Sequence, residues 1–307
     1  ARQYEELQAD VRAAAGGDAA GAGQHDARHG PDGARSAASR CAGGASDAVG
    51  RVRFRRTRGG TTLRLQGKAV LVTGAARRVG RSISLALGQR GARVAIHYNK
   101  SKADAERLAD DLRDSFGRDS LTVKADLTDV KQAAKMVDQV AKHFGALHVL
   151  VNNAAIYEKT PFEDVGVSDW NAHMNANLRA PFFLCQAAAP YMRKAGEGKI
   201  INIADWAAHR PYGGYMPYCI SKAGLLCLNT ALAKELAPEI QVNAILPGPV
   251  MLPENATPRT RKAVLDATLL KRLGTPDEVA KAVVFLIESA DYTTGAELTV
   301  DGGRLIA

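Results

Sequence analysis

This chain of 307 residues lacks the patterns that mark membrane, secreted and metal-binding proteins. Its four cysteines have neither the spacing of a metal site nor that of a disulfide framework. No apolar run approaches the ~18 residues of a membrane span. No charged start precedes an apolar segment, so we expect no secretory signal. These absences predict a cytoplasmic protein with no bound metal and no membrane partner.

A dense basic stripe is also missing. The net charge is +9, but the lysines and arginines are not interleaved with aromatic residues, which make up only 6% of the chain. Nucleic-acid binding is therefore a weak interpretation. A modest excess of basic residues suits an enzyme that attracts anionic ligands. We expect a small-molecule substrate and no nucleic-acid partner.

Large apolar side chains are almost absent from residues 1–64, which are rich in Ala, Gly, Arg and Asp. Such a segment cannot bury enough apolar area to offset the entropy of ordering it. We predict a disordered tail over 1–64 and a single folded domain over 65–307. The arginines between 51 and 58 leave contact with an acidic partner open, although a solvated linker is favoured.

From residue 65 onward, short apolar strands alternate with amphipathic helices. This alternation predicts an α/β fold with a doubly wound parallel sheet of the Rossmann type. Ligands of such sheets bind at the carboxyl ends of the strands. We expect strands at 68–74, 92–98, 120–126, 147–154, 198–204, 240–248 and 297–303, and helices at 79–90, 102–116, 129–144, 168–194, 216–237, 258–271 and 276–288.

A glycine-rich turn, "VTGAARRVGRSI", joins the first strand to the first helix. Gly74 and Gly80 suit a turn that presents backbone N–H groups and a helix N-terminus to a phosphate. Arg78 stands where a middle glycine is usual. Because any turn between a strand and a helix favours glycine, this motif alone is weak, and the later segments strengthen it.

The segment "HYNKS" after the second strand lacks the acid that selects NAD through its ribose hydroxyls. Tyr98, Asn99, Lys100 and Ser101 stand there instead, and Arg77 lies near the glycine turn. Two cations and two small polar groups suit a 2′-phosphate, which predicts NADPH. The alternative is that Lys100 and Ser101 simply begin a helix.

Two further segments extend the expected cofactor site. Asp126 in "ADLTD" is placed to reach the adenine, while Asp129 is a candidate cap of the next helix. Asn153 and the small Ala154 follow the fourth strand, where they let the backbone approach the cofactor.

Tyr218 and Lys222 are four residues apart and therefore lie on one face of a helix. A nearby ammonium stabilises a phenolate and lowers the tyrosine pKa from its usual ~10. Such a tyrosine can give a proton to a substrate during hydride transfer. We expect Asn177 to hold a water that links Lys222 to solvent; a packing amide is the alternative.

These motifs, together with "NNAA", "NANL", "PGP" and "TGAELTVDGG", resemble the short-chain dehydrogenase/reductase family over residues 67–305. The resemblance implies an NADP-dependent oxidoreductase that forms homotetramers. Most members carry a serine thirteen residues before the tyrosine, where this chain has Asp205. The implied catalytic residues are Asn177, Asp205, Tyr218 and Lys222. The implied cofactor-binding residues are Gly74, Arg77, Arg78, Gly80, His97, Tyr98, Asn99, Lys100, Ser101, Asp126, Leu127, Asn153, Ala154, Tyr218, Lys222, Pro247 and Gly248.

Within the family, the chain is most similar to pteridine reductases. These enzymes share the acid at Asp205, the arginine at Arg78, the "HYNKS" segment, and an aromatic residue at Tyr157 that stacks on the pterin. Ala155 departs from them, because a serine often stands there. The resemblance implies hydride transfer from NADPH to a pterin ring C=N, with Tyr218 as proton donor. The implied substrate residues are Arg78, Tyr157, Asp205 and Tyr218.

The acid at 205 has a chemical reason in that interpretation. A carboxylate beside Tyr218 opposes phenolate formation and keeps the phenol protonated. It can also accept a hydrogen bond from a pterin N–H or relay a proton. The alternative is that Asp205 only pairs with Lys222 or caps a turn. Two other functions stay open: an NADPH-dependent carbonyl reductase acting on a 3-oxoacyl thioester or sugar, and a non-catalytic NADP-binding regulator.

Overall fold

The computed structural model describes residues 63–252 and 256–307. The predicted tail over 1–64 therefore lies outside the described residues, apart from its last two positions. Leu63 is buried in the same core as Leu65. The backbone N–H of Leu65 donates to Glu288 Oε1 at 3.0 Å. The packed part of the chain thus includes Leu63.

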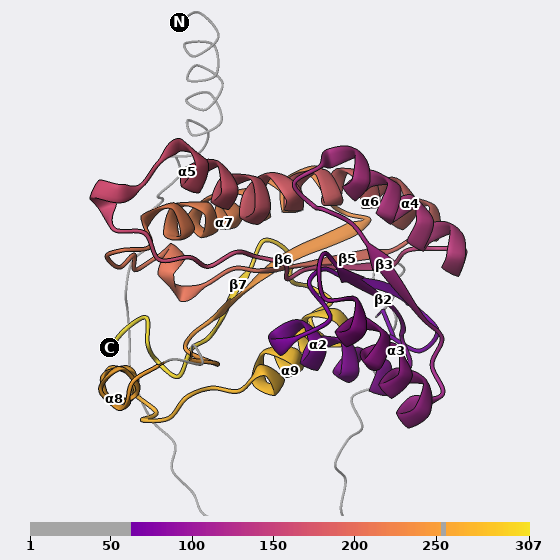
Figure 1. The fold of residues 1–307 in the computed structure, drawn as a ribbon. Coiled ribbons are helices and arrows are strands. Elements are labelled where there is room, and N and C mark those ends of the chain that lie inside the picture. The colour runs from indigo at the N-terminus through magenta and orange to yellow at the C-terminus, as the bar shows by residue number, and fades with distance from the viewer. Residues whose placement is uncertain (1–62, 253–255) are drawn as a thin grey trace, which may run out of the picture. The chain divides into compact units, whose positions relative to one another are not determined.

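Seven strands form one parallel sheet in the order β3-β2-β1-β4-β5-β6-β7 (Figure 1). This order confirms the doubly wound parallel sheet. The order in which the chain adds strands reverses between β1 and β4. Folds of this kind bind ligands in the crevice at the carboxyl ends of these two strands. The strands are β1 Ala69–Val72, β2 Arg93–Tyr98, β3 Ser120–Lys124, β4 Val149–Asn152, β5 Gly198–Ile203, β6 Ile240–Pro247 and β7 Glu297–Val300.

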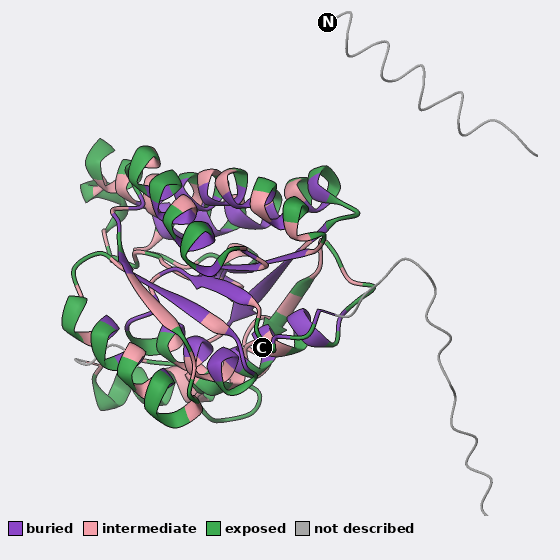
Figure 2. Ribbon diagram, turned by 90° about the vertical axis from the view of Figure 1, so that its right-hand side faces the viewer, coloured by how far each residue is buried: buried purple, intermediate pink, exposed green. Residues whose placement is uncertain are grey.

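Helices cover both faces of the sheet (Figures 1 and 2). On one face lie α2 Arg78–Gln89, α3 Lys102–Phe116 and α9 Pro276–Glu288; on the other lie α4 Val130–Phe144, α6 Ala180–Ala195 and α7 Met216–Leu236. Alternate side chains of one strand enter different cores: Val70 and Val72 face the first, and Ala69 and Leu71 the second. Burial on both faces explains why these strands are apolar throughout. None of the described helices is long and apolar enough to span a membrane.

One predicted helix is interrupted. The segment expected to be continuous over 168–194 consists of α5 Val167–Met174, a π-helical turn η2 Asn175–Arg179, and α6. Pro181, in the first turn of α6, has no N–H to donate to the carbonyl of Asn177, so the α-helical hydrogen-bond pattern cannot continue across this point. The wide turn places Asn177 in the interior, where it is buried.

The segment between β6 and α9 carries helix α8, Pro258–Asp266, which ends five residues earlier than predicted. Lys271 has φ +52°, a left-handed conformation that cannot continue a right-handed helix. Both ends of the segment are fixed, since Gly274 N donates to Pro249 O at 3.1 Å.

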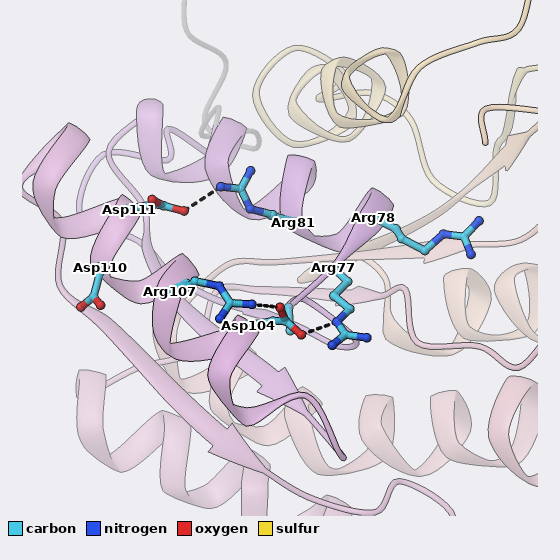
Figure 3. A pocket seen from close by; sticks show the side chains of 8 residues that line it. Arg77, Arg78, Arg81, Asp104, Arg107, Asp110 and Asp111 are labelled. Carbon is cyan, nitrogen blue, oxygen red and sulfur yellow. Dashed lines mark hydrogen bonds and ion pairs between the residues drawn. The ribbon is translucent and has the colours of Figure 1, made fainter. Parts of the chain in front are cut away.

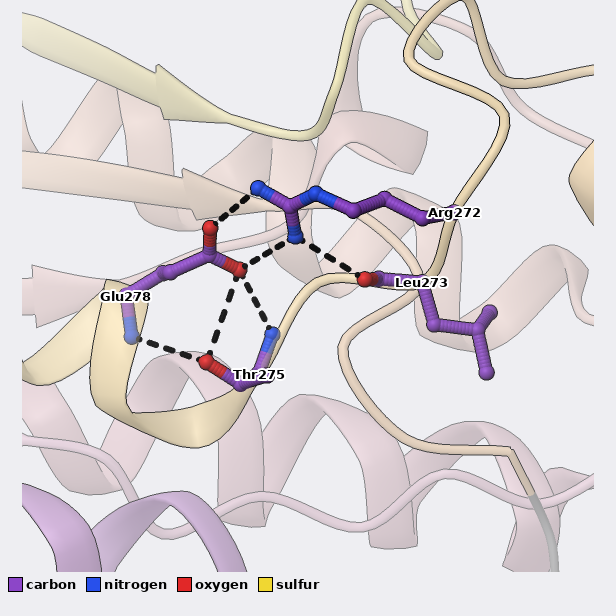
Figure 4. Close-up of polar contacts among 4 residues, drawn as sticks. All are labelled: Arg272, Leu273, Thr275 and Glu278. Carbon is purple, nitrogen blue, oxygen red and sulfur yellow. Dashed lines mark hydrogen bonds and ion pairs between the residues drawn. The ribbon is translucent and has the colours of Figure 1, made fainter.

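The start of α9 is held by a capping box (Figure 4). Glu278 accepts from Thr275 N at 2.8 Å and from Arg272 Nη1 at 3.0 Å. Arg272 and Thr275 together lower the pKa of the Glu278 carboxyl to about 2. The two remaining short elements are η1 Phe162–Asp164 and η3 Trp206–Ala208.

Candidate active site

The turn between β1 and α2 and the end of β4 form one close-packed unit. Gly74 has φ +61°, and a Cβ added there would lie 3.0 Å from Ala154 Cα. A Cβ on Gly80 would overlap the carbonyl oxygen of Gly74. Asn153 Nδ2 donates to the carbonyls of Thr73 at 2.8 Å and Gly74 at 3.1 Å. Both glycines are therefore required by close approach of the backbone.

His97 supports this turn from inside the protein. Its buried ring accepts from Gly74 N through Nδ1 at 3.0 Å, and Nε2 lies 3.1 Å from Ala125 O. Burial lowers the pKa of His97, which favours the neutral ring with its proton on Nε2. Its side chain joins the glycine turn to the ends of β2 and β3, and its contact with the cofactor stays a prediction.

A groove between α2 and α3 lies beside the turn (Figure 3). It is lined by Ala76, Arg77, Arg78, Arg81, Asp104, Arg107, Asp110 and Asp111. Asp104 pairs with both Arg77 and Arg107, and its pKa is lowered chiefly by the hydrogen bond from Arg77. Arg77 therefore has its charge balanced by an acid, which weakens its predicted role at a 2′-phosphate.

Arg78 and Lys100 differ from Arg77 because neither has an ion pair within the described residues. Arg78 adopts φ +52°, and its side chain extends away from the acids of the groove (Figure 3). Lys100 is exposed, and Ser101 stands at the N-terminus of α3 without a side-chain capping bond. Ser101 thus begins a helix, as one interpretation held, and its hydroxyl is not used as the cap.

The other predicted cofactor residues follow strands at the same edge of the sheet. Asp126 and Leu127 follow β3, and Pro247 and Gly248 close β6, with Gly248 N donating to Val300 O at 2.9 Å. Asp129 caps α4 by accepting from two backbone N–H groups, which confirms that expectation. Asp126 Oδ1 accepts from Thr128 N at 2.9 Å and from its hydroxyl at 2.7 Å, so this oxygen is occupied by a turn.

The buried Tyr218 and Lys222 lie beside the half-buried Asp205 at the end of β5. Tyr218 Oη donates to Asp205 Oδ2 at 2.7 Å, and Ala207 N donates to Asp205 Oδ1 at 2.8 Å. Lys222 Nζ donates to Ile203 O at 2.8 Å and lies 5.8 Å from the centre of the Tyr218 ring. Asp205 therefore caps a turn with one oxygen and binds the phenol with the other. Among the described residues, it makes no ion pair with Lys222.

The electrostatics correct one sequence prediction. Burial, followed by the charge of Asp205 and its hydrogen bond, raises the pKa of Tyr218 well above its usual value of 10.0. A net lowering by Lys222 is therefore wrong, whereas the expectation that the carboxylate keeps the phenol protonated agrees with the raised pKa. Burial lowers the pKa of Lys222 itself to about 8, although Asp205 opposes that change. Burial also raises the pKa of Asp205. The phenol thus keeps its proton at neutral pH.

Asn177 fixes the segment after β4 to α7. Its Oδ1 accepts from Ile156 N at 2.9 Å, and its Nδ2 donates to Ile156 O and to Ser221 Oγ, both at 3.0 Å. The side chain is therefore engaged with protein groups on both its oxygen and its nitrogen. A water link to Lys222 remains a prediction.

Aromatic side chains lie around Tyr218. The Tyr157 ring lies edge-on to Tyr218 at 4.8 Å between centroids and stacks on Tyr215 at 4.5 Å. Two further contacts in this region were not expected from the sequence. His173 is buried with its ring 6.5 Å from that of Tyr218, and Arg304 lies over the Trp206 ring at 5.0 Å. The sequence could have indicated that His173 belongs to the site, because it precedes Asn177 by four residues. Nothing in the sequence indicated Arg304.

Comparisons with known proteins agree with this geometry. A family described as Enoyl-(Acyl carrier protein) reductase matches residues 74–304. The chain is 35% identical to the 3-oxoacyl-[acyl-carrier-protein] reductase FabG of Thermotoga maritima, over 80% of this chain and 100% of that protein. It is 34% identical to FabG of Staphylococcus aureus, over 77% of this chain and 97% of that protein.

Solved structures show the same likeness. A short-chain dehydrogenase/reductase from Serratia marcescens has a TM-score of 0.75 and 35% identity, covering 79% of this chain and 100% of that one. A blue fluorescent protein from a metagenomic library, in complex with NADPH, has a TM-score of 0.73 and 34% identity, covering 79% and 99% of the two chains.

Proposed function

The chain belongs to the short-chain dehydrogenase/reductase family and is an oxidoreductase, and we propose that it reduces a small-molecule carbonyl compound with NADPH. The observation that carries the proposal is the Tyr218 hydroxyl, which is held by Asp205 Oδ2 at 2.7 Å beside Lys222. These groups follow the strand next to β4, close to the crevice at which the strand order reverses.

NADPH, when bound, supplies the hydride. The close packing at Gly74 and Gly80 fixes the turn before α2, and the N-terminus of this helix would hold the pyrophosphate. The cations available for a 2′-phosphate are Arg78 and Lys100, with Ser101 beside them, and no acid follows β2 to select NAD. The similar metagenomic protein is itself complexed with NADPH. These residues fit the phosphorylated cofactor.

Side chains of this protein then hold and transfer the proton. Tyr218, kept protonated by burial and by Asp205, donates its proton to the oxygen that becomes the alcohol. Lys222, held on Ile203 O, limits the cost of the negative charge that develops on the phenol. Asn177 positions the segment after β4 against α7.

A carbonyl substrate has the better support of the two candidates. The two curated relatives compared above are named as 3-oxoacyl-[acyl-carrier-protein] reductases. These names support a carbonyl substrate, which was the alternative in the sequence analysis, better than they support a pterin substrate. We therefore place ketones of the 3-oxoacyl-thioester type first.

Pterin reduction remains a second candidate because of a specific observation. Asp205 stands where most of the family carries a serine, and its carboxylate accepts the Tyr218 hydrogen bond instead of donating one to a carbonyl. Tyr157, with 48% of its surface exposed next to Tyr218, offers a ring on which a flat heterocycle can stack.

One experiment separates the candidates: NADPH oxidation is followed with acetoacetyl-coenzyme A, dihydrobiopterin and dihydrofolate, using wild type and Asp205→Ser. A ketone reductase turns over the thioester, and the serine variant keeps at least a third of that activity. A pterin reductase turns over the pterins and loses at least tenfold in the variant. Tyr218→Phe serves as the inactive control. Tight NADPH binding without turnover of any substrate would contradict both assignments and favour a non-catalytic regulator.

A further inference from the structure

A continuous row of aromatic rings runs from the catalytic tyrosine to the C-terminal segment. Tyr157 lies against Tyr218 at 4.8 Å and stacks on Tyr215 at 4.5 Å with an interplanar angle of 13°. Tyr215 meets Tyr212 at 5.3 Å, and Tyr212 stacks on Trp206 at 5.4 Å. No step between neighbouring ring centroids exceeds 5.4 Å. In a chain with only 6% aromatic residues, this concentration marks a built surface.

The row is only partly covered by protein. Tyr157 is 48% exposed, and Trp206, Tyr212 and Tyr215 are all of intermediate exposure. The hydroxyls of Tyr212 and Tyr157 lie 3.2 Å apart, so the two rings are held in fixed relative positions. Rigid, half-exposed aromatic faces beside a reactive group are typical of a ligand groove.

The far end of the row is cationic. The Arg304 guanidinium lies 5.0 Å above the Trp206 ring, and its Nη1 donates to Ala267 O at 2.7 Å. Arg210 donates from Nη1 to the carbonyls of Arg304 at 3.3 Å and Leu305 at 3.4 Å. Arg210 also donates to an oxygen of Ala307, the last residue, whereas Arg304 has no carboxylate partner within the part of the chain that the structure describes.

The acids nearest in sequence to these arginines are already engaged. Asp301 accepts from the backbone N–H groups of Gly303 at 2.8 Å and Leu305 at 2.7 Å. Glu297 pairs with His209 at 2.6 Å. The positive charge of Arg304 is thus not neutralised by Asp301 or Glu297.

We propose that this row is the track on which the substrate lies, and that Arg304 binds an anionic substituent of it, a carboxylate or a phosphate. The proposal rests on the proposed function, because the reducible bond must be at Tyr218. An apolar or planar portion contacts the tyrosines, and the anion lies at Arg304, beside the Trp206 ring. Arg304 then selects substrates with a long anionic tail over short neutral ones.

The test compares two ketones that differ in the tail, acetoacetyl-coenzyme A and ethyl acetoacetate, with wild type, Arg304→Gln and Arg304→Lys. Glutamine can still donate to Ala267 O, so the segment keeps its anchor. We expect KM for the thioester to rise at least tenfold in Arg304→Gln, with kcat within twofold, because a charge-assisted contact is lost. The same variant should leave ethyl acetoacetate within twofold, and Arg304→Lys should restore most of the loss.

Arg272→Gln is the matched control, since it removes an arginine that pairs with Glu278 at the start of α9. Dihydrofolate, which has a carboxylate tail, and dihydrobiopterin, which has none, form a second pair of substrates. In this pair the tail anion is a carboxylate, where coenzyme A has phosphates. An equal rise in KM for tailed and tail-free substrates, or no rise for either, would overturn the proposal.

A binding readout keeps this test independent of turnover. Coenzyme A is titrated while Trp206 fluorescence is followed in a Trp170→Phe background, which leaves Trp206 as the one tryptophan. The proposal predicts saturable quenching whose Kd rises at least tenfold in Arg304→Gln. Quenching without turnover of any ketone or pterin would defeat the proposed function and leave the anion site standing. Absence of quenching in wild type would defeat the anion site alone.

Discussion

Replacing Asp205 by asparagine removes a charge from Tyr218 and keeps the shape of the side chain. The amide oxygen can still accept from Ala207 N, so the turn at η3 is retained. The lost interaction is the 2.7 Å hydrogen bond from Tyr218 to a half-buried carboxylate. A hydrogen bond to a charged group contributes about 1.5–3 kcal/mol. Because one pKa unit corresponds to about 1.4 kcal/mol, the variant should shift the tyrosine's titration by about one to two units.

The sign of the shift follows from which form the carboxylate favours. Asp205 raises the pKa of Tyr218, and its charge also opposes the fall of the Lys222 pKa to about 8. Removing that charge lets both groups lose their protons at lower pH. The basic limb of kcat/KM for NADPH oxidation should therefore move downward in Asp205→Asn, by about one pH unit or more.

A similar pair elsewhere provides the control. Tyr191 donates to Asp138 Oδ1 at 2.7 Å, between α6 and α4 and away from the site. Asp138→Asn removes the same kind of bond and should leave the pH profile of activity unchanged. A basic limb that stays in place in Asp205→Asn, or that moves equally in the two variants, would refute the electrostatic argument.

Three further changes test other parts of the site. The preference for NADPH is measured as kcat/KM with NADPH divided by kcat/KM with NADH. This ratio should fall about tenfold in Lys100→Ala because one phosphate contact is lost. Lys102→Ala should leave the ratio unchanged. His97 has its pKa lowered below 6.5 by burial, so its contribution to stability is lost as pH falls from 6.5; His97→Asn should flatten the fall in Tm between pH 7 and 5. Asn177→Ala removes three hydrogen bonds, so its free energy of unfolding in urea should fall by about 2–4 kcal/mol. The fall should be smaller in Ser221→Ala, which removes one of these bonds and the bond from Ser221 Oγ to Tyr218 O.

Much of the fold was predictable because the sequence shows the hydrophobic patterns of buried strands and of amphipathic helices. Strands buried on both faces are continuous apolar runs, as in Val70–Val72, and the helices between them are amphipathic. The strand order follows from right-handed crossovers on a parallel sheet. The interruption of the helix at Asn175–Arg179 was not visible, because Pro181 is also a favoured residue near a helix start.

The site was predictable in its members and less so in its electrostatics. The spacing of Tyr218 and Lys222 placed both on one helix, and the structure places Asp205 against the phenol. The direction of the Tyr218 pKa depends on how deeply the cluster is buried and which group touches the hydroxyl, and spacing carries neither fact. Arg304 lies 86 positions from Tyr218 in the chain, so its place at the end of the aromatic row depends on the tertiary fold.

The geometry of the site depends on the number of residues in the wide turn at Asn175–Arg179. Successive residues of an α-helix are about 100° apart around its axis. Deleting one residue to restore regular helix would remove the extra residue that the wide turn accommodates, and would turn the residues of this turn relative to α5 and α6. Asn177 could then no longer meet both Ile156 and Ser221, although every side chain of the cluster would still be present. A single-residue deletion here would disable the enzyme by misalignment alone.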